Sequence, residues 1–343
     1  MIRRGGPVVA LLALMAGFGL GVYHLFGLFR TETTKAAAAP SETRPLIALP
    51  GTLYLAQQGV IYRLRDGSFA RFTRDARSWS QPALSPDDHL VAVARSSQSS
   101  DLYLLDGSGA VAGQITHNAG SGRDITTNHW AFYPHVGADG MRVYFAYDAP
   151  KDRQQTYRVD FAIWSDAVTG AAAQLRQLST PNDYTGGDVS PIPLASGGLL
   201  YVRYGVDAQE HIVSRIVRRS PNGLLTPLTT EAEDCSAPAL SPDATTLAMV
   251  CSGSRSQTAK LEVATFDGVT LGQRRVLIGD QLCAVPAWSP DGRGLAYLAP
   301  ATTGGRFQLW WLAGATTPAP PPRQQVTENL DFDATSAPAW SGS

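Results

Sequence analysis

Hydrophobic positions follow two different patterns along this chain. Residues 7–29 form one apolar run with no Asp, Glu, Lys or Arg and with His24 as its one titratable basic residue. At about 1.5 Å per residue, a helix of this length spans a hydrocarbon core of about 30 Å. Beyond residue 50, short stretches of alternating hydrophobic and polar residues are separated by Gly, Pro, Asp and Ser, which is typical of strands joined by tight turns. The pattern therefore predicts one apolar N-terminal helix followed by a long all-β region.

The apolar run 7–29 predicts a single transmembrane helix. Arg3 and Arg4 precede it, and the positive-inside rule places residues 1–6 in the cytoplasm and the β region outside it, in the periplasm or at the cell surface. Residues 30–49 are polar and contain Ala and Pro, so we expect a flexible linker. A cleaved signal peptide is the alternative, although its apolar region is normally only about 7 to 15 residues long.

A repeat of roughly 50 residues runs through the β region, slightly above the spacing of common four-stranded propeller blades. The clearest copies are QPALSPDDHLVAVA from Gln81, APALSPDATTLAMV from Ala237 and VPAWSPDGRGLAYLA from Val285. Weaker copies and the chain end fit the same frame. The leading prolines of the six copies are Pro82, Pro134, Pro191, Pro238, Pro286 and Pro338. Six copies predict an all-β, six-bladed β-propeller of four-stranded antiparallel blades.

Local chemistry supports this interpretation. Ser-Pro-Asp is a tight-turn sequence, so Asp87, Asp243 and Asp291 are expected to shape hairpins. Fourth strands are expected to end in an apolar residue followed by Thr or Ser, and blade five departs from this at Leu277-Ile278. The five endings are Phe72-Thr73, Ile115-Thr116, Leu178-Ser179, Leu228-Thr229 and Val326-Thr327.

The two ends of the β region complement each other. The last copy stops one strand into a blade, at residues 337–341, whereas the strands predicted from residue 53 onward continue where that copy stops. We therefore expect the C-terminal strand 337–341 to close a propeller of residues 50–343 by completing its first blade, which removes the exposed edges of an open array.

The three cysteines allow one disulfide. In the blade-five hairpin, pairing Leu240 with Thr246 places Cys235 opposite Cys251, within disulfide reach. Cys283 occupies the same repeat position as Cys235 one blade later, so a bridge between blades is the alternative.

The Pro-x-Trp/Leu-Ser-Pro-Asp-Gly hairpin, the Leu-Ala-Tyr run and the Leu-Thr strand ending resemble the repeats of TolB-like propellers over residues 50–343. The resemblance implies an extracytoplasmic six-bladed propeller that mostly binds proteins, a class that also occurs as substrate-gating domains of oligopeptidases. Two departures from the family pattern are expected: a membrane anchor in place of a cleavable signal, and no separate N-terminal α/β domain.

Loops from the fourth strand of one blade to the first strand of the next are expected to gather at one mouth of the central channel. They are rich in carboxylates, which would attract a cationic peptide segment or Ca²⁺. The alternative is ordinary turn chemistry. The candidates are Asp75, Arg77, Trp79, His117, Arg123, Asp124, Asp183, Tyr184, Asp188, Glu233, Asp234, Asp280, Asp331 and Asp333, together with Asn118, Asn128, Asn182 and Glu231.

Other chemistry changes the picture little. His117 and His129 flank Asp124 and could ligate a metal, but their spacing matches no dense metal-binding motif. No cofactor is predicted, and Ca²⁺ at the acidic mouth is the alternative. The net charge of −1 gives no field toward nucleic acid, which is not an expected partner. No nucleophile elbow or zinc-protease motif occurs, so an enzyme is not expected.

These observations predict a membrane-anchored, extracytoplasmic binding module for a protein or peptide, within an envelope complex. A propeller hydrolase or lyase with an acidic, Ca²⁺-binding channel is the alternative. A third hypothesis is a spacer subunit whose blade edges contact its neighbours.

Overall fold

The computed structural model describes residues 37–119, 127–148, 160–170, 174–253, 258–320 and 322–342. The chain separates into two compact units, 1–37 and 38–343, and the architecture below is that of the second unit. The predicted transmembrane helix, residues 7–29, lies outside the described residues. Within the described ranges, no helix has the length and hydropathy needed to cross a membrane.

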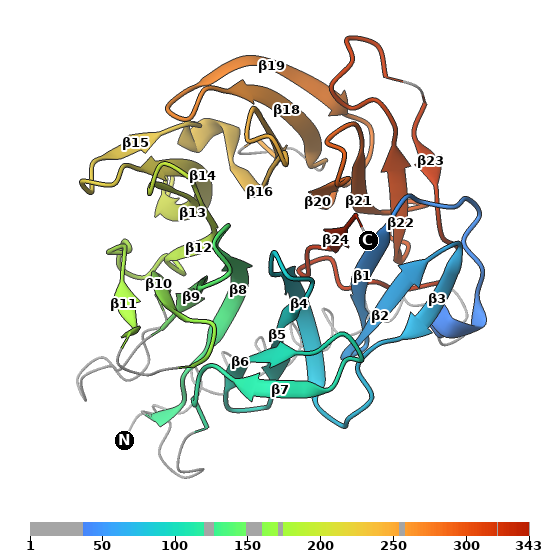
Figure 1. Cartoon of the computed structure of the whole chain (residues 1–343). Coiled ribbons are helices and arrows are strands. Elements are labelled where there is room, and N and C mark those ends of the chain that lie inside the picture. The colour runs from blue at the N-terminus through green and yellow to red at the C-terminus, as the bar shows by residue number, and fades with distance from the viewer. Residues whose placement is uncertain are drawn as a thin grey trace, which may run out of the picture. The chain divides into compact units, whose positions relative to one another are not determined.

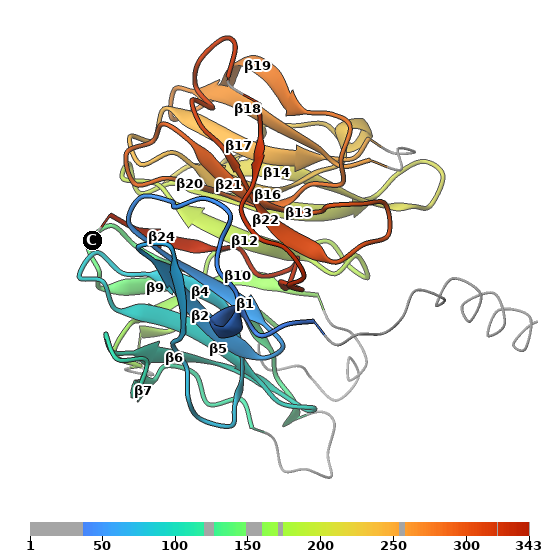
Figure 2. The ribbon, with the colours of Figure 1, turned by 90° about the vertical axis from the view of Figure 1, so that its right-hand side faces the viewer.

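The described strands form six four-stranded antiparallel sheets around a central channel, seen down the channel in Figure 1 and edge-on in Figure 2. The predicted all-β propeller is thereby confirmed. From the innermost strand outward, blade one contains β24 (Ala339–Ser341), β1 (Thr52–Gln57), β2 (Val60–Arg65) and β3 (Ser68–Arg71). Blade two contains β4 (Ser78–Leu84), β5 (Leu90–Arg95), β6 (Ser100–Leu105) and β7 (Val111–Gln114). Blade three contains β8 (Ala131–Val136), β9 (Arg142–Tyr147), β10 (Ala162–Ala167) and β11 (Arg176–Gln177).

The remaining three blades follow in chain order. Blade four contains β12 (Asp188–Pro193), β13 (Leu199–Val206), β14 (Ile212–Arg219) and β15 (Leu225–Pro227). Blade five contains β16 (Cys235–Leu240), β17 (Thr246–Cys251), β18 (Lys260–Phe266) and β19 (Leu271–Ile278). Blade six contains β20 (Ala284–Trp288), β21 (Leu295–Pro300), β22 (Phe307–Leu312) and β23 (Gln324–Gln325). The described residues also contain two short 3₁₀ helices, η1 (Pro40–Glu42) and η4 (Glu231–Glu233).

The ring closes between the two ends of the propeller. The innermost strands contact one another in the order β24, β4, β8, β12, β16, β20 and back to β24. Strand β24 pairs with β1 so that Leu53 lies opposite Trp340, and the Trp340 indole N–H donates a 2.7 Å hydrogen bond to the Pro50 carbonyl. The predicted closure by the C-terminal strand is therefore confirmed.

The Ser-Pro-Asp turns act as the sequence predicts. In blade five the Ser241 hydroxyl donates to the Asp243 carboxylate at 2.6 Å and accepts the Thr246 backbone N–H at 2.9 Å. In blade six Ser289 makes the same contacts with Asp291 and Gly294. The repeat aspartates stabilise hairpins and lie outside the channel.

In five blades, a Thr or Ser that follows the fourth strand holds the third strand of the same blade. Its hydroxyl accepts a buried backbone N–H at 2.8–3.0 Å in five blades. Blade five has no such residue. There the Leu261 backbone N–H meets the sulfur of Cys283, whose pKa is raised to about 12 by burial despite this hydrogen bond. The departure of blade five from the repeat ending therefore has a structural substitute.

Residues 38–49 lie against the propeller, although the sequence places them in the linker. The Ala38 backbone N–H donates to the Asn329 carbonyl at 3.1 Å, and the Leu46 N–H donates to the Val326 carbonyl at 2.7 Å. Leu49 is buried in the core that contains Leu53. The globular unit therefore begins at Ala38 instead of residue 50. The physical reason is that apolar side chains of this segment, such as Leu49, pack against the propeller core.

Cys235 and Cys251 form a disulfide, and the buried Cys283 is free. The two cysteines lie directly opposite each other, as expected, but Leu240 pairs with Leu247 instead of Thr246. A β-bulge between Ser236 and Ala239 shifts the register by one residue along the hairpin. The predicted register was therefore wrong at the turn, and the bulge restores the facing pair at the cysteines.

Candidate functional site

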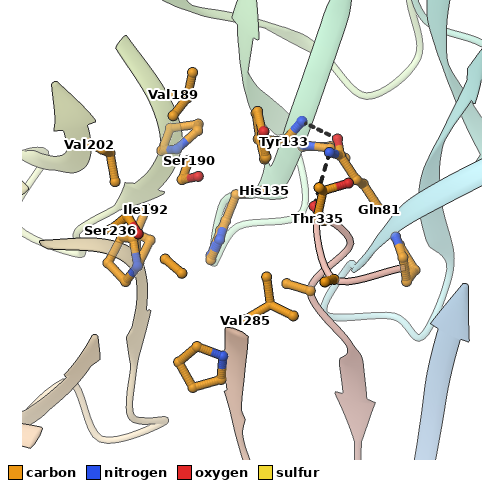
Figure 3. Close-up of a pocket in the computed structure, with 18 of the residues that line it drawn as sticks. Gln81, Tyr133, His135, Val189, Ser190, Ile192, Val202, Ser236, Val285 and Thr335 are labelled. Carbon is orange, nitrogen blue, oxygen red and sulfur yellow. Dashed lines mark hydrogen bonds between the residues drawn. The ribbon is translucent and has the colours of Figure 1, made fainter. Parts of the chain in front are cut away.

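The six repeat prolines meet at the centre of the ring. They line two adjoining cavities of about 330 and 280 Å³ that together form the central channel. Five of the prolines line the first cavity, and Pro338 lines the second. Figure 3 shows the first cavity, into which the His135 side chain projects from β8. The prolines that mark the repeat in sequence are thus also the wall of the channel.

A β-bulge stands at the same place in five innermost strands. In each case the proline and the residue before it face a single residue of the second strand. The residue before the proline has a positive φ, between 37° and 55°, which is costly for a residue other than glycine. These residues are Gln81, Tyr133, Ser190, Ala237 and Val285. Since bulges redirect the chain and its side chains, the repeated strain shapes the channel wall.

Hydrogen bonds join three blades at one side of this wall. The Gln81 side chain accepts the Tyr133 backbone N–H at 2.7 Å and donates to the Thr335 carbonyl at 3.3 Å, as Figure 3 shows. The Gln81 backbone N–H donates to the Ser336 hydroxyl at 2.7 Å. Blades one, two and three are therefore linked through a single glutamine at the channel.

The channel interior is uncharged at neutral pH. Among the described residues that line the two cavities, the titratable side chains are Tyr133, Tyr204 and His135, with no carboxylate, lysine or arginine. Burial raises the pKa of Tyr133 to about 12 and raises that of Tyr204, and burial lowers the pKa of His135 to about 4. The cavity can therefore offer hydroxyl groups and a neutral imidazole to a ligand.

The predicted mouth residues of blade two form a closed local group. The Asp75 carboxylate accepts the Trp79 indole N–H at 2.6 Å and pairs with Arg77. Burial raises the pKa of Asp75, but the hydrogen bonds from Trp79 and Arg77 lower it, and the net shift is downward. Trp79 is 1% exposed and packs on Tyr103, so it is a core side chain and its assignment to the channel mouth was wrong.

The acidic residues of blades three and four have different surroundings. Asp183 and Tyr184 are exposed, and Tyr184 is 78% accessible. Asp188 is fully buried and pairs with Arg203. Its carboxylate therefore faces the interior of blade four and not the channel.

The carboxylates of Glu233, Asp234 and Asp280 are each engaged in local hydrogen bonds or ion pairs. Glu233 caps η4 through Thr230 and pairs with Arg274. Asp234 accepts the backbone N–H and the hydroxyl of Ser214, both at 2.8 Å. Asp280 pairs with Arg323 through two hydrogen bonds.

The segment before β24 holds two acidic residues, Asp331 and Asp333, against strand β1 of blade one. The Asp333 backbone N–H donates to the Ala56 carbonyl, and its carboxylate accepts the Thr335 N–H at 2.9 Å. The Asp331 backbone N–H donates to the Gln57 side chain at 2.9 Å. The negative charges of Asp333 and Asp234 raise the pKa of the channel residues Tyr133 and Tyr204, respectively, as minor contributions beside burial. These two carboxylates are the predicted acids that act on the channel.

The remaining candidates do not assemble into a metal centre within the described residues. His117 is exposed, whereas Arg123 and Asp124 lie outside the described residues. The neighbouring Asn118 is buried and accepts the Tyr147 hydroxyl at 3.0 Å. Across the described ranges, no group of three or more His, Cys, Asp and Glu side chains is placed to hold a metal ion.

Sequence reasoning missed the side chains that do line the channel. Tyr133 and His135 flank the repeat proline Pro134, and Ser190 precedes Pro191. The signal was present, because the repeat prolines were recognised and their neighbours share their strand. The pattern of charged residues favoured the loops instead, because the carboxylates concentrate in the connections and not in the innermost strands.

No protein-family model and no curated protein matches this sequence. Solved structures do match its fold. The crystal structure of TolB from Acinetobacter baumannii has a TM-score of 0.60 at 16% identity, over 89% of this chain and 68% of that chain. A putative TolB from Agrobacterium tumefaciens has a TM-score of 0.55 at 14% identity, over 85% of this chain and 97% of that chain. This chain therefore has the fold of the TolB propeller.

The TolB-like fold also occurs inside larger enzymes. The tricorn protease matches with a TM-score of 0.54 at 14% identity, over 83% of this chain but only 27% of that chain. At such identities the likeness shows the fold alone, since one propeller fold serves many functions.

Proposed function

We propose that this TolB-like propeller is an envelope protein, anchored by residues 7–29, that binds a peptide segment of a partner protein at its central channel. The observation that carries the proposal is the channel itself, a cavity of about 330 Å³ lined by proline rings, tyrosines and a neutral histidine. Apolar walls with a few hydrogen-bonding groups are typical of binding sites.

The chemistry of the channel defines the segment it would accept. Proline rings and aromatic side chains bind apolar groups, and the hydroxyls of Tyr133 and Tyr204 bind polar uncharged ones. A charged side chain would lose its hydration in a cavity without an opposite charge. The partner segment would therefore insert uncharged side chains, while any cationic residues remain outside near Asp234 and Asp333.

The alternative of a hydrolase or lyase with an acidic channel has less support. Its carboxylates were expected to face the channel, whereas the described residues that line the cavities include none. The carboxylates of Asp188 and Asp280 are engaged by arginines. A binding role needs no such groups.

Site-specific photo-crosslinking in native membranes tests the proposal. A photoreactive residue at Tyr204, which lines the cavity, should attach to one envelope protein. The variant His135→Trp, which fills the channel, should reduce that adduct at least tenfold. A photoreactive residue at Val276, 49% exposed on the outer strand β19, is the matched control and should give no such adduct.

The opposite pattern would change the conclusion. An adduct from position 276 with none from position 204 would support a spacer that contacts its neighbours through blade edges. Equal adducts with and without His135→Trp would contradict insertion into the channel. The anchor is tested in the same membranes by alkaline extraction, which should release a chain lacking residues 1–36 and retain the full chain.

A further inference from the structure

A second cavity lies away from the channel, between the outer parts of blades three and four. This lateral groove has a volume of about 450 Å³. One wall is the segment Gln177 to Thr180 of blade three, and the other contains Tyr201, Arg203, Arg219 and Leu225 of blade four. Figure 1 shows β11 and β15, the outermost strands of these two neighbouring blades.

Arg203 lines the lateral groove and is held in a fixed position by hydrogen bonds. Its guanidinium donates two hydrogen bonds of 2.8 Å to Asp188, one of 2.7 Å to the Thr180 carbonyl and one of 3.3 Å to the Tyr201 hydroxyl. Its central carbon also lies 5.6 Å from the Tyr201 ring centroid. Because Asp188 balances its charge, Arg203 is held in place and contributes little net charge of its own.

Arg219 supplies the uncompensated charge of the groove. It lies opposite Leu199 and Leu225 in the sheet, at the end of β14. A Cβ atom at Gly223 would be 3.6 Å from its Nη2 atom, so the guanidinium lies across the glycine turn. Its charge also lowers the pKa of Tyr201 against the larger effect of burial.

No ion pair or side-chain hydrogen bond of Arg219 occurs among the residues that the structure describes. The groove is therefore lined by two guanidinium groups, one of which is paired with the buried Asp188, and this leaves a net charge of about +1. A guanidinium presents two parallel N–H donors that match the oxygens of a carboxylate or phosphate. Leu178 and Leu225 add apolar surface beside it.

We propose that the lateral groove is a binding site for a small organic oxyanion, with Arg219 as its recognition residue. The oxyanion accepts the paired N–H donors of Arg219, and the apolar part of the ligand packs on Leu178 and Leu225. Arg203 and Asp188 position Tyr201 beneath the site. This proposal stands apart from peptide binding at the channel, since the two cavities share no lining residue.

Equilibrium dialysis of the full chain in mild detergent against radiolabelled inorganic phosphate tests the proposal, at constant ionic strength. We expect one saturable site per chain. Arg219→Gln should weaken phosphate binding roughly tenfold to a hundredfold, since a hydrogen bond to a charged group contributes about 1.5 to 3 kcal/mol. Arg219→Lys should retain binding in part, because it keeps the charge without the paired donors. Arg44→Gln, which removes an exposed arginine elsewhere, is the control and should bind as the wild type does.

Competition then distinguishes the source of the oxyanion. Benzoate displacing phosphate at lower concentration than acetate would indicate an organic carboxylate with an apolar body, whereas phenyl phosphate displacing it best would indicate a phosphate ester. Non-saturable phosphate binding, or equal binding by the wild type and by an Arg219→Gln variant with an unchanged thermal transition, would overturn the proposal.

Discussion

The carboxylate of Asp188 lies directly across the β12–β13 ladder from Arg203, and each of its oxygens accepts a hydrogen bond of 2.8 Å from that guanidinium. Asp188 is completely buried, and Arg203 is largely so. The sequence suggested Asp188 as a ligand-binding residue at the channel mouth. Its surroundings show a structural role, because it orders the first two strands of blade four.

Replacing Asp188 should therefore affect stability. We expect Asp188→Ala to lower the free energy of unfolding by about 3 to 5 kcal/mol, because it leaves a buried guanidinium without its partner. Urea unfolding measures this change. Glu328→Ala, which removes an exposed carboxylate, is the control and should cost less than about 0.5 kcal/mol. Equal, small effects at both positions would show that the buried pair contributes little.

His135 should make stability depend on pH. Burial lowers its folded-state pKa to about 4, below the value of about 6.5 in the unfolded chain. Between these values the unfolded chain binds more protons, so the contribution of His135 is present above pH 6.5 and is lost as the pH falls toward 4. We expect a loss of about 1 to 3 kcal/mol, allowing for partial solvent access. Urea unfolding of the wild type and of His135→Gln at pH 7, 5 and 4 isolates this slope, which should be shallower in the variant.

The Thr hydroxyl that follows a fourth strand should stabilise its blade through one buried hydrogen bond. Thr229 accepts the Ile216 backbone N–H at 2.9 Å. Thr229→Val keeps the shape and leaves that N–H without an acceptor, which should cost about 1 to 3 kcal/mol. Thr226→Val on β15 is the control, because Thr226 makes no comparable side-chain hydrogen bond among the described residues. Equal destabilisation of the two variants in urea would contradict this role.

The disulfide should stabilise the blade-five hairpin. Its cysteines are 16 residues apart, and a loop of about that size is worth about 3 kcal/mol through the unfolded chain. The double variant Cys235→Ala, Cys251→Ala should lose about this amount in thermal or urea unfolding. The free thiol of Cys283, buried and with a pKa of about 12, should react with a thiol reagent only after unfolding. Three reactive thiols in the unreduced, unfolded wild type would contradict the bridge.

Ring closure should control the cooperativity of the whole propeller. Deleting residues 335–343 removes β24 and its pairing with β1. We expect the thermal transition to fall by at least about 10 °C or to lose its single cooperative step. Trp340→Phe, which keeps an aromatic ring and loses the hydrogen bond to Pro50, should cause a much smaller shift. An unchanged transition after the deletion would show that the ring is stable without its closing strand.

Much of the architecture could be predicted because it depends on turn and strand preferences of neighbouring residues. A proline, a Ser-Pro-Asp turn and an alternating run recur together, and each has a turn or strand preference of its own. Complementary chain ends at Leu53 and Trp340 predicted closure for the same reason. The facing cysteines were also predictable, although the bulge near Pro238 was not, since a one-residue shift in register leaves no mark in the hydrophobic pattern.

The candidate site was less predictable. Loop carboxylates such as Asp75, Asp188 and Asp280 were expected at the channel. Each instead pairs with a nearby arginine or backbone N–H, because an unpaired carboxylate inside an apolar cavity would lose its hydration without compensation. Tyr133 and His135, in contrast, face the channel because a bulge turns their strand there.

The sequence by itself determined the repeat, the number of blades and the strand that closes the ring, because turn and strand preferences act over a few neighbouring residues. Only the tertiary structure decided that the channel is lined by proline and uncharged side chains and that residues 38–49 belong to the globular unit. It also decided that Arg219, beside Arg203, has no carboxylate partner among the described residues. These features depend on which side chains of different blades come within a few ångströms of one another, and no local preference encodes that distance.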